Sequence, residues 1–358
     1  MGTYCSCLKI HSLDEKQLEM PYQISIDQKL IKSEIFSSNI PAYSIPELIY
    51  LQSFLRGYID RKHVQSIACM GFRNSLIQQD SIKKSFKEIE EKDLPGFYTK
   101  SLSKCEKKFG KFPFVEIQAS DIIKKGFAEV EDGAIYNGGW NEDYEKIGPG
   151  TQVWPDGSVY QGQWVSDKAC GNGRLVHNDG DIYIGNWKDG KTNGFGQYSH
   201  ANGAKYTGDW KDDKHDGNGC EMWPDGAKYE GRYIEGKKWL WGVYRWSDGS
   251  KYEGEFQDNS IHGKGTYEWA DGRKFTGDWK FNKMDGKGEF WWSDGRRYKG
   301  EYLNDKKHGY GVFEWNDGRR YEGYWLNGKQ HGRGIYTTSE NVTEGEWKYG
   351  KRVKINHT

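Results

Sequence analysis

The feature that most constrains this chain is a 23-residue period that fills the sequence from about residue 126 to residue 350. Each copy reads Tyr-x-Gly-x-Trp, then Gly-x-Gly, then Trp-x-Asp-Gly. A half copy precedes the full ones at Gly126, and a degenerate tenth begins at Thr343. A constant period of this length predicts a repeat architecture in which every unit packs on its neighbours. The nine full copies are spaced by 24 residues once and by 23 thereafter, and they begin at Tyr136, Tyr160, Tyr183, Tyr206, Tyr229, Tyr252, Phe275, Tyr298 and Tyr321.

Within one unit, aromatic residues alternate with glycine at every second position. Tyr252, Gly254 and Phe256 show this pattern, and Gly265 and Tyr267 repeat it. A period of two with aromatic enrichment predicts two short strands per unit. The Asp-Gly link before the next unit predicts a tight turn, and we expect a looser turn after Phe256. The expected fold is mainly β, an elongated single-sheet solenoid of antiparallel β-hairpins whose core is made of aromatic rings lying over glycines.

Composition divides the chain near residue 130. All 16 Trp lie at or after Trp140, and 41 of the 47 Gly lie at or after Gly133. We therefore expect an α-helical N-terminal region over 11–125, the repeat array over 126–350 and a tail over 351–358. Lys and Arg number 52, as do Asp and Glu, so the formal net charge is zero. This argues against a nucleic-acid partner held by phosphate neutralisation, and no apolar run approaches the roughly 20 residues of a membrane-spanning helix.

The unit that begins at Tyr298 and continues through Gly309, Gly311 and Trp315 to Gly318 resembles the MORN (membrane occupation and recognition nexus) repeat family. The resemblance implies single-sheet hairpin arrays that serve as scaffolds, dimerisation surfaces or membrane-proximal tethers. The chain is similar to radial spoke head-type MORN proteins. That similarity implies other scaffold or axonemal proteins as partners, possible self-association, and an intracellular placement at a plasma or ciliary membrane or in the ciliary axoneme.

One unit departs from the pattern, because Leu240 stands where the first glycine of Gly-x-Gly belongs. The expected result is extra apolar bulk at a turn, as a bend or a contact patch. Tryptophan is enriched at interaction hot spots, so four tryptophans are candidates for partner contact, with simple core packing as an equal alternative. These candidates are Trp239, Trp241, Trp291 and Trp292.

The residue just before the leading aromatic is basic in six units, and two interpretations are open. A basic ladder on the outer face could bind anionic lipid headgroups, or it could form cross-strand ion pairs on a solvated face. From residue 133 onward the chain has 33 basic and 34 acidic residues, a balance that favours ion pairs. The six residues are Lys205, Lys228, Lys251, Lys274, Arg297 and Arg320.

Before the array, Ser44 to Glu47 form a capping box that predicts a helix over 44–66. Within it the pattern [ILV]QxxxRGxxxR resembles the IQ motif, which implies binding of calmodulin or a calmodulin-like light chain. The alternative is an ordinary helix packed in a small domain or against the sheet. A second, solvated helix is expected over 80–92, and 93–125 reads as a connector. The IQ-like residues are Leu51, Gln52, Arg56, Gly57 and Arg61.

The first seven residues fit an acylation signal. Gly2 and Ser6 match the N-myristoylation pattern, and one myristoyl chain needs a second anchor for stable membrane binding. Cys5 and Cys7 are placed to carry palmitoyl chains as that anchor. The alternative is an unmodified N-terminus with two incidental cysteines.

Motifs for catalysis, metal binding and cofactors are not found in this sequence. The six cysteines form no CxxC pair, and their low number predicts a reducing, intracellular compartment. We therefore expect a non-catalytic scaffold without cofactors that docks partner proteins, binds calmodulin and meets a membrane through N-terminal acyl chains. The alternative is a membrane-binding module whose sheet recognises anionic phospholipids.

Overall fold

A computed structural model of the chain describes residues 87–114 and 122–356. The chain divides into two units, residues 1–66 and 67–358, and every described residue belongs to the second. The acylation segment 1–10 and the IQ-like helix 44–66 therefore lie outside the described residues and stay predictions.

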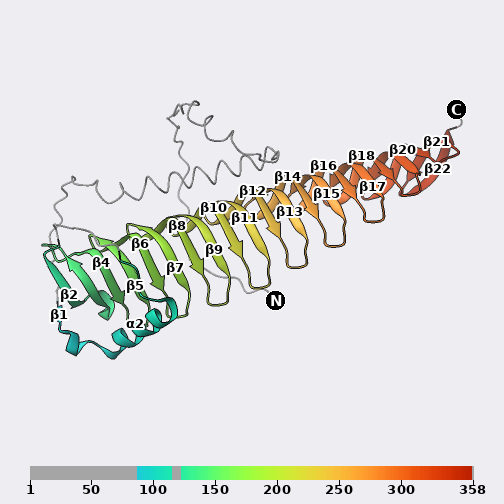
Figure 1. The fold of residues 1–358 in the computed structure, drawn as a ribbon. Helices are drawn as coiled ribbons and strands as arrows, with labels where there is room; N and C mark the ends of the chain where they lie inside the picture. Colours follow the sequence, from blue (N-terminus) through green and yellow to red (C-terminus); the bar gives the residue numbers. More distant parts are fainter. Residues whose placement is uncertain (1–86, 115–121, 357–358) are drawn as a thin grey trace, which may run out of the picture. The chain divides into compact units, whose positions relative to one another are not determined.

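The described residues form one 22-stranded antiparallel sheet with one α-helix (Figure 1). Each strand pairs with the next in chain order, which gives a continuous meander and confirms the expected mainly β hairpin array. The helix is α2 (Gly96–Phe109), with short 3-10 turns η1 (Glu91–Asp93) and η2 (Glu131–Gly133). The strands are β1 (Lys87–Ile89), β2 (Lys124–Glu129), β3 (Ile135–Trp140), β4 (Lys146–Val153), β5 (Val159–Val165), β6 (Lys168–Val176), β7 (Ile182–Lys188), β8 (Lys191–Ser199), β9 (Lys205–Lys211), β10 (Lys214–Met222), β11 (Lys228–Ile234), β12 (Lys237–Arg245), β13 (Lys251–Gln257), β14 (Ser260–Glu268), β15 (Lys274–Lys280), β16 (Lys283–Trp291), β17 (Arg297–Leu303), β18 (Lys306–Glu314), β19 (Arg320–Leu326), β20 (Lys329–Thr337), β21 (Val342–Lys348) and β22 (Lys351–Asn356).

The two turns of each unit differ from the expectation. After Phe256 the chain reverses through only two residues, Asp258 and Asn259, both at positive φ (54° and 67°). Two such residues make the tight type I′ hairpin that Asp and Asn favour. The Asp-Gly link is the longer one, because five residues from Trp269 to Arg273 separate β14 from β15. The expected order of tight and loose turns was therefore wrong.

The core is a ladder of aromatic rings that lies on one side of the sheet, here called the aromatic face. The leading aromatic of each unit contacts the second aromatic of its own unit and that of the next, always edge to face. Tyr252, for example, has ring-centroid distances of 5.2 Å to Phe256 and 5.7 Å to Trp279. The ladder runs unbroken from Trp140 to Trp347. Edge-to-face pairs add favourable energy beyond the area they bury.

Paired glycines explain how these rings fit against the backbone. Gly254 lies opposite Gly265 in adjacent strands, and the Tyr252 ring covers both. A Cβ at either glycine would collide with this ring, so the position requires glycine. The Tyr252 hydroxyl donates to the Glu255 carbonyl oxygen at 3.0 Å, which satisfies the buried phenol. The expected role of the inward glycines is confirmed.

The segment before the array differs from the expectation. Residues 87–89 form strand β1, which pairs with β2, where a solvated helix was expected over 80–92. Residues 96–109 form α2 inside the expected connector. Tyr98 and Cys105 of α2 are buried against Ile135, Val153 and Val159. This helix lies over the first strands on the side away from the aromatic rings. At the other end, residues 351–356 of the expected tail form β22, which pairs with β21.

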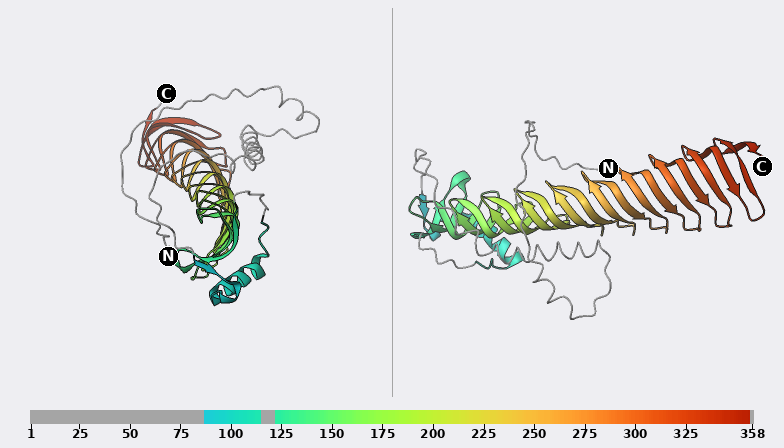
Figure 2. Two further views of the ribbon diagram at one scale, coloured as in Figure 1. Left: turned by 90° about the vertical axis from the view of Figure 1, so that its left-hand side faces the viewer. Right: turned by 90° about the horizontal axis from the view of Figure 1, so that it is seen from above.

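In Figure 2 the colours of the strands follow the sequence along the sheet, in agreement with the pairing of each strand with the next. Neighbouring hairpins are tied together at the two-residue turns, because the second turn residue contacts the preceding unit. The Asn259 side-chain oxygen accepts a hydrogen bond from the Lys238 backbone N–H at 2.8 Å, and Asn282 does the same for Ile261. No helix within 87–114 and 122–356 is long and apolar enough to cross a membrane.

Candidate docking site on the polar face

The sheet surface opposite the aromatic ladder is here called the polar face. Charged and hydroxyl side chains line it over β13 and β14, where Lys251 and Glu253 lie opposite Glu268 and Thr266. Within the described strands, five of the six basic residues that precede a leading aromatic are paired there with glutamates, and Lys205 is the exception. The pairs are Lys228–Glu230 at 2.8 Å, Lys251–Glu253 at 2.6 Å, Lys274–Glu268 at 3.1 Å, Arg297–Glu289 at 2.6 Å and Arg320–Glu322 at 2.6 Å.

Each unit contains a bulge in which three residues lie opposite one. In the Tyr252 unit, His262, Gly263 and Lys264 lie opposite Glu255. The Glu255 carboxylate accepts a hydrogen bond from the Lys264 backbone N–H at 3.1 Å. The middle residue, Gly263, has φ of 59°, and a Cβ there would collide with the same carboxylate. Glycine and the facing acid therefore form one device, which recurs with Asp209 and Gly217.

The Tyr229 unit changes both parts of this device. Its bulge, here called the apolar bulge, consists of Trp239, Leu240 and Trp241, and the residue opposite is Arg232. Leu240 has the left-handed backbone conformation, with φ of 57°, although a residue with a Cβ disfavours this conformation. A residue other than glycine in this region costs on the order of 1–3 kcal/mol, and such strain gathers at functional sites.

The strained residue is also exposed to solvent. Leu240 is 51% exposed and Trp241 is 43% exposed, whereas Trp239 is half-buried. A large aliphatic and a large aromatic side chain thus stand next to each other on a surface of ion pairs. Exposed apolar groups framed by polar ones mark interaction sites.

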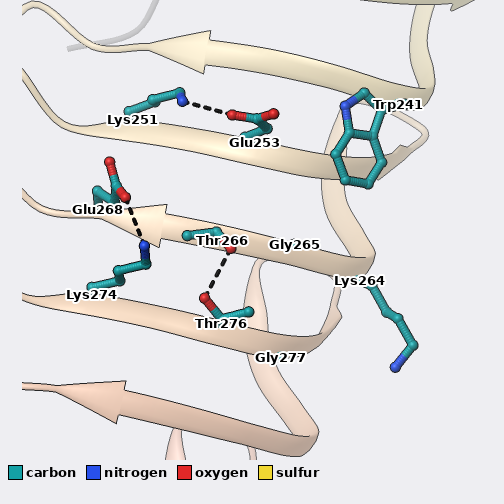
Figure 3. A pocket seen from close by; sticks show the side chains of 10 residues that line it. All are labelled: Trp241, Lys251, Glu253, Lys264, Gly265, Thr266, Glu268, Lys274, Thr276 and Gly277. Carbon is teal, nitrogen blue, oxygen red and sulfur yellow. Dashed lines mark hydrogen bonds and ion pairs between the residues drawn. The ribbon is translucent and has the colours of Figure 1, made fainter. Parts of the chain in front are cut away.

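Trp241 also forms one end of a pocket of about 490 Å³ on the polar face, which spans β12 to β15 (Figure 3). Thr266 and Thr276 lie in its floor and share a hydrogen bond of 2.9 Å. Two ion pairs, Lys251–Glu253 and Lys274–Glu268, flank this floor. The Lys264 side chain turns away from the floor toward Asp278, at 2.8 Å. The site therefore offers one aromatic wall, two hydroxyls and balanced charge.

The four predicted contact tryptophans do not form one cluster. Trp291 lies on the polar face in β16, one strand beyond the pocket, where its neighbours across the ladder are Lys274 and Arg297. Trp292 packs on the aromatic face, 4.4 Å from Phe290 and 5.4 Å from Phe313 between ring centroids. Trp241 and Trp291 therefore bracket the pocket, and Trp292 belongs to the core side.

The polar residues of the pocket and Arg232 were not predicted from the sequence. The signal in this unit was Leu240 in place of glycine, whereas Arg232 replaces no constant residue, because only four of the nine full units have an acid at its position. The pocket residues gave no such signal, because threonine and paired charges recur on solvated strands. Within the described residues, no group of three or more His, Cys, Asp or Glu side chains could hold a metal ion.

The repeats match the family model described as MORN repeat in ten segments, the first at 136–159 and the last at 344–353. MORN repeats are generally protein- or lipid-interaction modules. A search of curated proteins finds no match.

Among solved structures, the TCP10 domain of Danio rerio CPAP, solved in complex with a peptide of Danio rerio STIL, is similar at 13% identity. It covers 60% of this chain and 98% of that chain, with a TM-score of 0.36. The TCP domain of Drosophila melanogaster SAS-4 (dCPAP), solved with a proline-rich motif of Ana2 (dSTIL), gives 13% identity, 58% and 96% coverage, and a TM-score of 0.22. A virginiamycin B lyase from Staphylococcus aureus gives 12% identity, 66% and 74% coverage, and a TM-score of 0.14. Likenesses this weak carry no functional weight for this chain.

Proposed function

Because this chain belongs to the MORN repeat family, we propose that it is a non-catalytic scaffold that docks a partner protein on its polar face. The docking site is the apolar bulge together with the adjoining pocket. The single observation that carries this proposal is Leu240, which is both strained at φ of 57° and 51% exposed. Folding gains nothing from that combination, whereas a partner that covers Leu240 and Trp241 would gain a buried anchor.

The dimensions of the site suit a short segment of a partner. From β12, which carries Trp241, to β16, which carries Trp291, the sheet advances four strands, or about 19 Å at about 4.8 Å per strand. An extended segment of about six residues spans that distance. The paired charges along the pocket would fix the register of the bound segment. They would attract the segment little at long range, because their net charge is small.

A comparative affinity purification tests the docking proposal. Full-length wild type, Trp241→Ser and Lys287→Ser are expressed at equal levels, and the co-purified proteins are quantified. Lys287 takes the place of Trp241 two units later, so it is a matched control. We expect one partner to be retained by wild type and Lys287→Ser and lost from Trp241→Ser. The docking proposal fails if every co-purified protein is retained equally by Trp241→Ser.

We also propose that the segment 44–66 binds calmodulin or a calmodulin-like light chain. The support is the IQ-like pattern at Leu51, Gln52, Arg56, Gly57 and Arg61. Lobes of this class grip a basic amphipathic helix by its apolar anchors. A pull-down of the full chain with calmodulin, with and without calcium, tests it. Binding that survives Gln52→Ala with Arg56→Ala would place the contact elsewhere, and no binding by wild type would end the proposal.

Membrane attachment, at a plasma or ciliary membrane or beside the axoneme, is proposed to depend on acylation at Gly2, Cys5 and Cys7. The competing possibility is that the sheet itself reads anionic phospholipids. The ion pairs on the polar face leave few free cations for that role. Protein purified from cells is sedimented with liposomes that contain phosphatidylserine. We expect the variant Gly2→Ala with Cys5→Ser and Cys7→Ser to stay in the supernatant, and its undiminished sedimentation would make the sheet the lipid reader.

A further inference from the structure

A half-buried lysine on the aromatic face lies at a position where other units supply an oxygen atom as its partner. Lys238 and Lys307 each occupy the ninth position after the leading aromatic, three units apart. They lie opposite Tyr233 and Tyr302 in the neighbouring strand. Lys146 has the equivalent place in the first unit, with its one inserted residue.

Lys146 and Lys238 have internal partners. Lys238 Nζ lies 3.0 Å from Glu221 Oε2, and the same oxygen accepts a hydrogen bond from the Tyr233 hydroxyl at 2.9 Å. Lys146 Nζ donates to Gln152 Oε1 at 2.8 Å. The fold therefore provides a carboxylate or an amide oxygen for an ammonium group in this position.

In the Lys307 unit both partner positions hold phenylalanine. Phe290 precedes Lys307 by 17 residues, as Glu221 precedes Lys238, and Phe313 follows it by six, as Gln152 follows Lys146. Within the part of the chain that the structure describes, Lys307 Nζ forms no hydrogen bond or ion pair, and the buried Tyr302 hydroxyl has no partner. The oxygen that the other sites contain is missing here.

Aromatic rings surround the Lys307 ammonium instead. Its Nζ lies 4.3 Å from the ring centroid of Trp325 and 4.4 Å from that of Phe313, with Tyr298 at 5.4 Å and Trp292 at 5.6 Å. These contacts stabilise the cation in part. Burial, and secondarily the charge of Arg296, lowers the pKa of Lys307 to about 8, so the group stays mainly protonated at neutral pH.

The Lys307 side chain lines a cavity of about 260 Å³. Two lysines, one glutamine and three aromatic rings provide its side-chain lining, and none of the lining residues is acidic. The cavity therefore offers two positive charges beside apolar aromatic rings. Its principal lining residues are Lys307, Phe313, Trp315, Trp325, Lys329 and Gln330.

We propose that the cavity at Lys307 is a carboxylate-binding site. A carboxylate of the ligand would pair with Lys307 as the Glu221 carboxylate pairs with Lys238. A glutamate side chain of a partner protein fits this chemistry, because its carboxylate meets the ammonium and its methylenes meet the rings. A small free carboxylate shares the same chemistry. The site lies on the face opposite the docking pocket, so it is independent of the proposed docking function.

The test uses the full chain labelled with 5-fluorotryptophan and follows the ¹⁹F signals of Trp325 and Trp292, assigned by single Trp→Phe changes. The probes are Ac-Gly-Glu-Gly-NH₂ and its glutamine counterpart, and acetate with acetamide, all at constant ionic strength. We expect saturable shifts with the glutamate peptide and with acetate, and none with the neutral counterparts. Tighter binding of the peptide than of acetate assigns a protein ligand, and the reverse order assigns a small carboxylate.

Variants make the test specific to Lys307. Lys307→Met should abolish the shifts, and Lys238→Met, which alters the lysine that already has its carboxylate, should leave them unchanged. Phe290→Glu should block binding by restoring the internal partner, and its ¹⁹F spectrum reports whether the array stays folded. Equal shifts from the glutamate and glutamine peptides, or shifts that persist in Lys307→Met, would overturn the proposal.

Discussion

Single residues decide where this regular array becomes specific. Leu240 is the clearest case, because the other full units have glycine at its position and the backbone keeps its left-handed conformation regardless. Arg232 faces it in the neighbouring strand, at a position that is acidic in four of the nine full units. A strained and exposed leucine in the one full unit that lacks this glycine indicates a site that has exchanged some stability for an exposed apolar contact.

We predict that Leu240→Gly raises the free energy of unfolding by about 0.5–1 kcal/mol. Glycine removes the left-handed strain, and its greater freedom in the unfolded chain offsets part of the gain. Leu240→Ala is the control, since alanine retains the Cβ and should give no gain. Equilibrium urea denaturation of the three proteins measures the difference. A Leu240→Gly protein less stable than wild type would show that the leucine packs usefully in the free chain.

His215 carries a pH dependence. Its ring stacks on Tyr206 at 3.5 Å between centroids, and burial lowers its pKa to about 4. In the unfolded chain His215 is protonated near pH 6.5, whereas in the folded chain it stays neutral down to about pH 4. The free energy of unfolding should therefore fall as the pH drops from 6.5 to 4. We predict that His215→Met reduces this fall by about 1–3 kcal/mol, because Met284 occupies the same place in another unit. Thermal unfolding at pH 4.5 and 7.5 measures it, and an unchanged pH slope would contradict the assignment.

At the scale of elements, the period in the sequence predicted the hairpins well. Alternation of aromatic residues and glycines is a local signal, and each unit sees nearly the same neighbours. The signal for the tight turn was also present at Asp258 and Asn259, a pair suited to type I′ geometry. Helix α2 was not predictable in the same way. Its position depends on which strands expose apolar residues on the polar face, and only the assembled sheet brings Ile135, Val153 and Val159 together beneath it.

Arg174 fixes the C-terminal end of α2 to the sheet. Its guanidinium donates to the carbonyl oxygens of Phe109 at 3.2 Å and Gly110 at 2.9 Å, and it is only 4% exposed. We predict that Arg174→Met weakens the docking of α2 by about 2–3 kcal/mol, since hydrogen bonds to a charged donor are lost in a buried place.

Hydrogen exchange measures that effect. Amides of residues 96–109 should exchange at least tenfold faster in Arg174→Met, whereas amides of β13 to β20 should be unchanged, because units in an array contact only their neighbours. Gln197→Met, the same position one unit later, is the matched control. Unchanged exchange in α2 would show that apolar packing alone holds the helix.

For the molecule as a whole, the repeated units form a long surface, and units that depart from the repeat pattern mark candidate binding sites on it. The polar face pairs its own charges and so attracts little at a distance, the apolar bulge offers an anchor near its middle, and the Lys307 cavity opens on the other face. The candidate tryptophans were visible in the sequence. The face that each one occupies was not assigned, because it depends on the neighbours that the assembled sheet provides, which are Lys274 for Trp291 and Phe290 for Trp292.

The most direct test of the central claim is the dissociation constant of the partner that affinity purification recovers, measured by calorimetry with full-length proteins. We predict that Trp241→Ser raises this constant at least 30-fold, since loss of a hot-spot aromatic costs about 2 kcal/mol or more. Lys287→Ser should leave it within twofold. A Trp241→Ser protein that binds as tightly as wild type, or an equal loss in Lys287→Ser, would contradict docking at the apolar bulge.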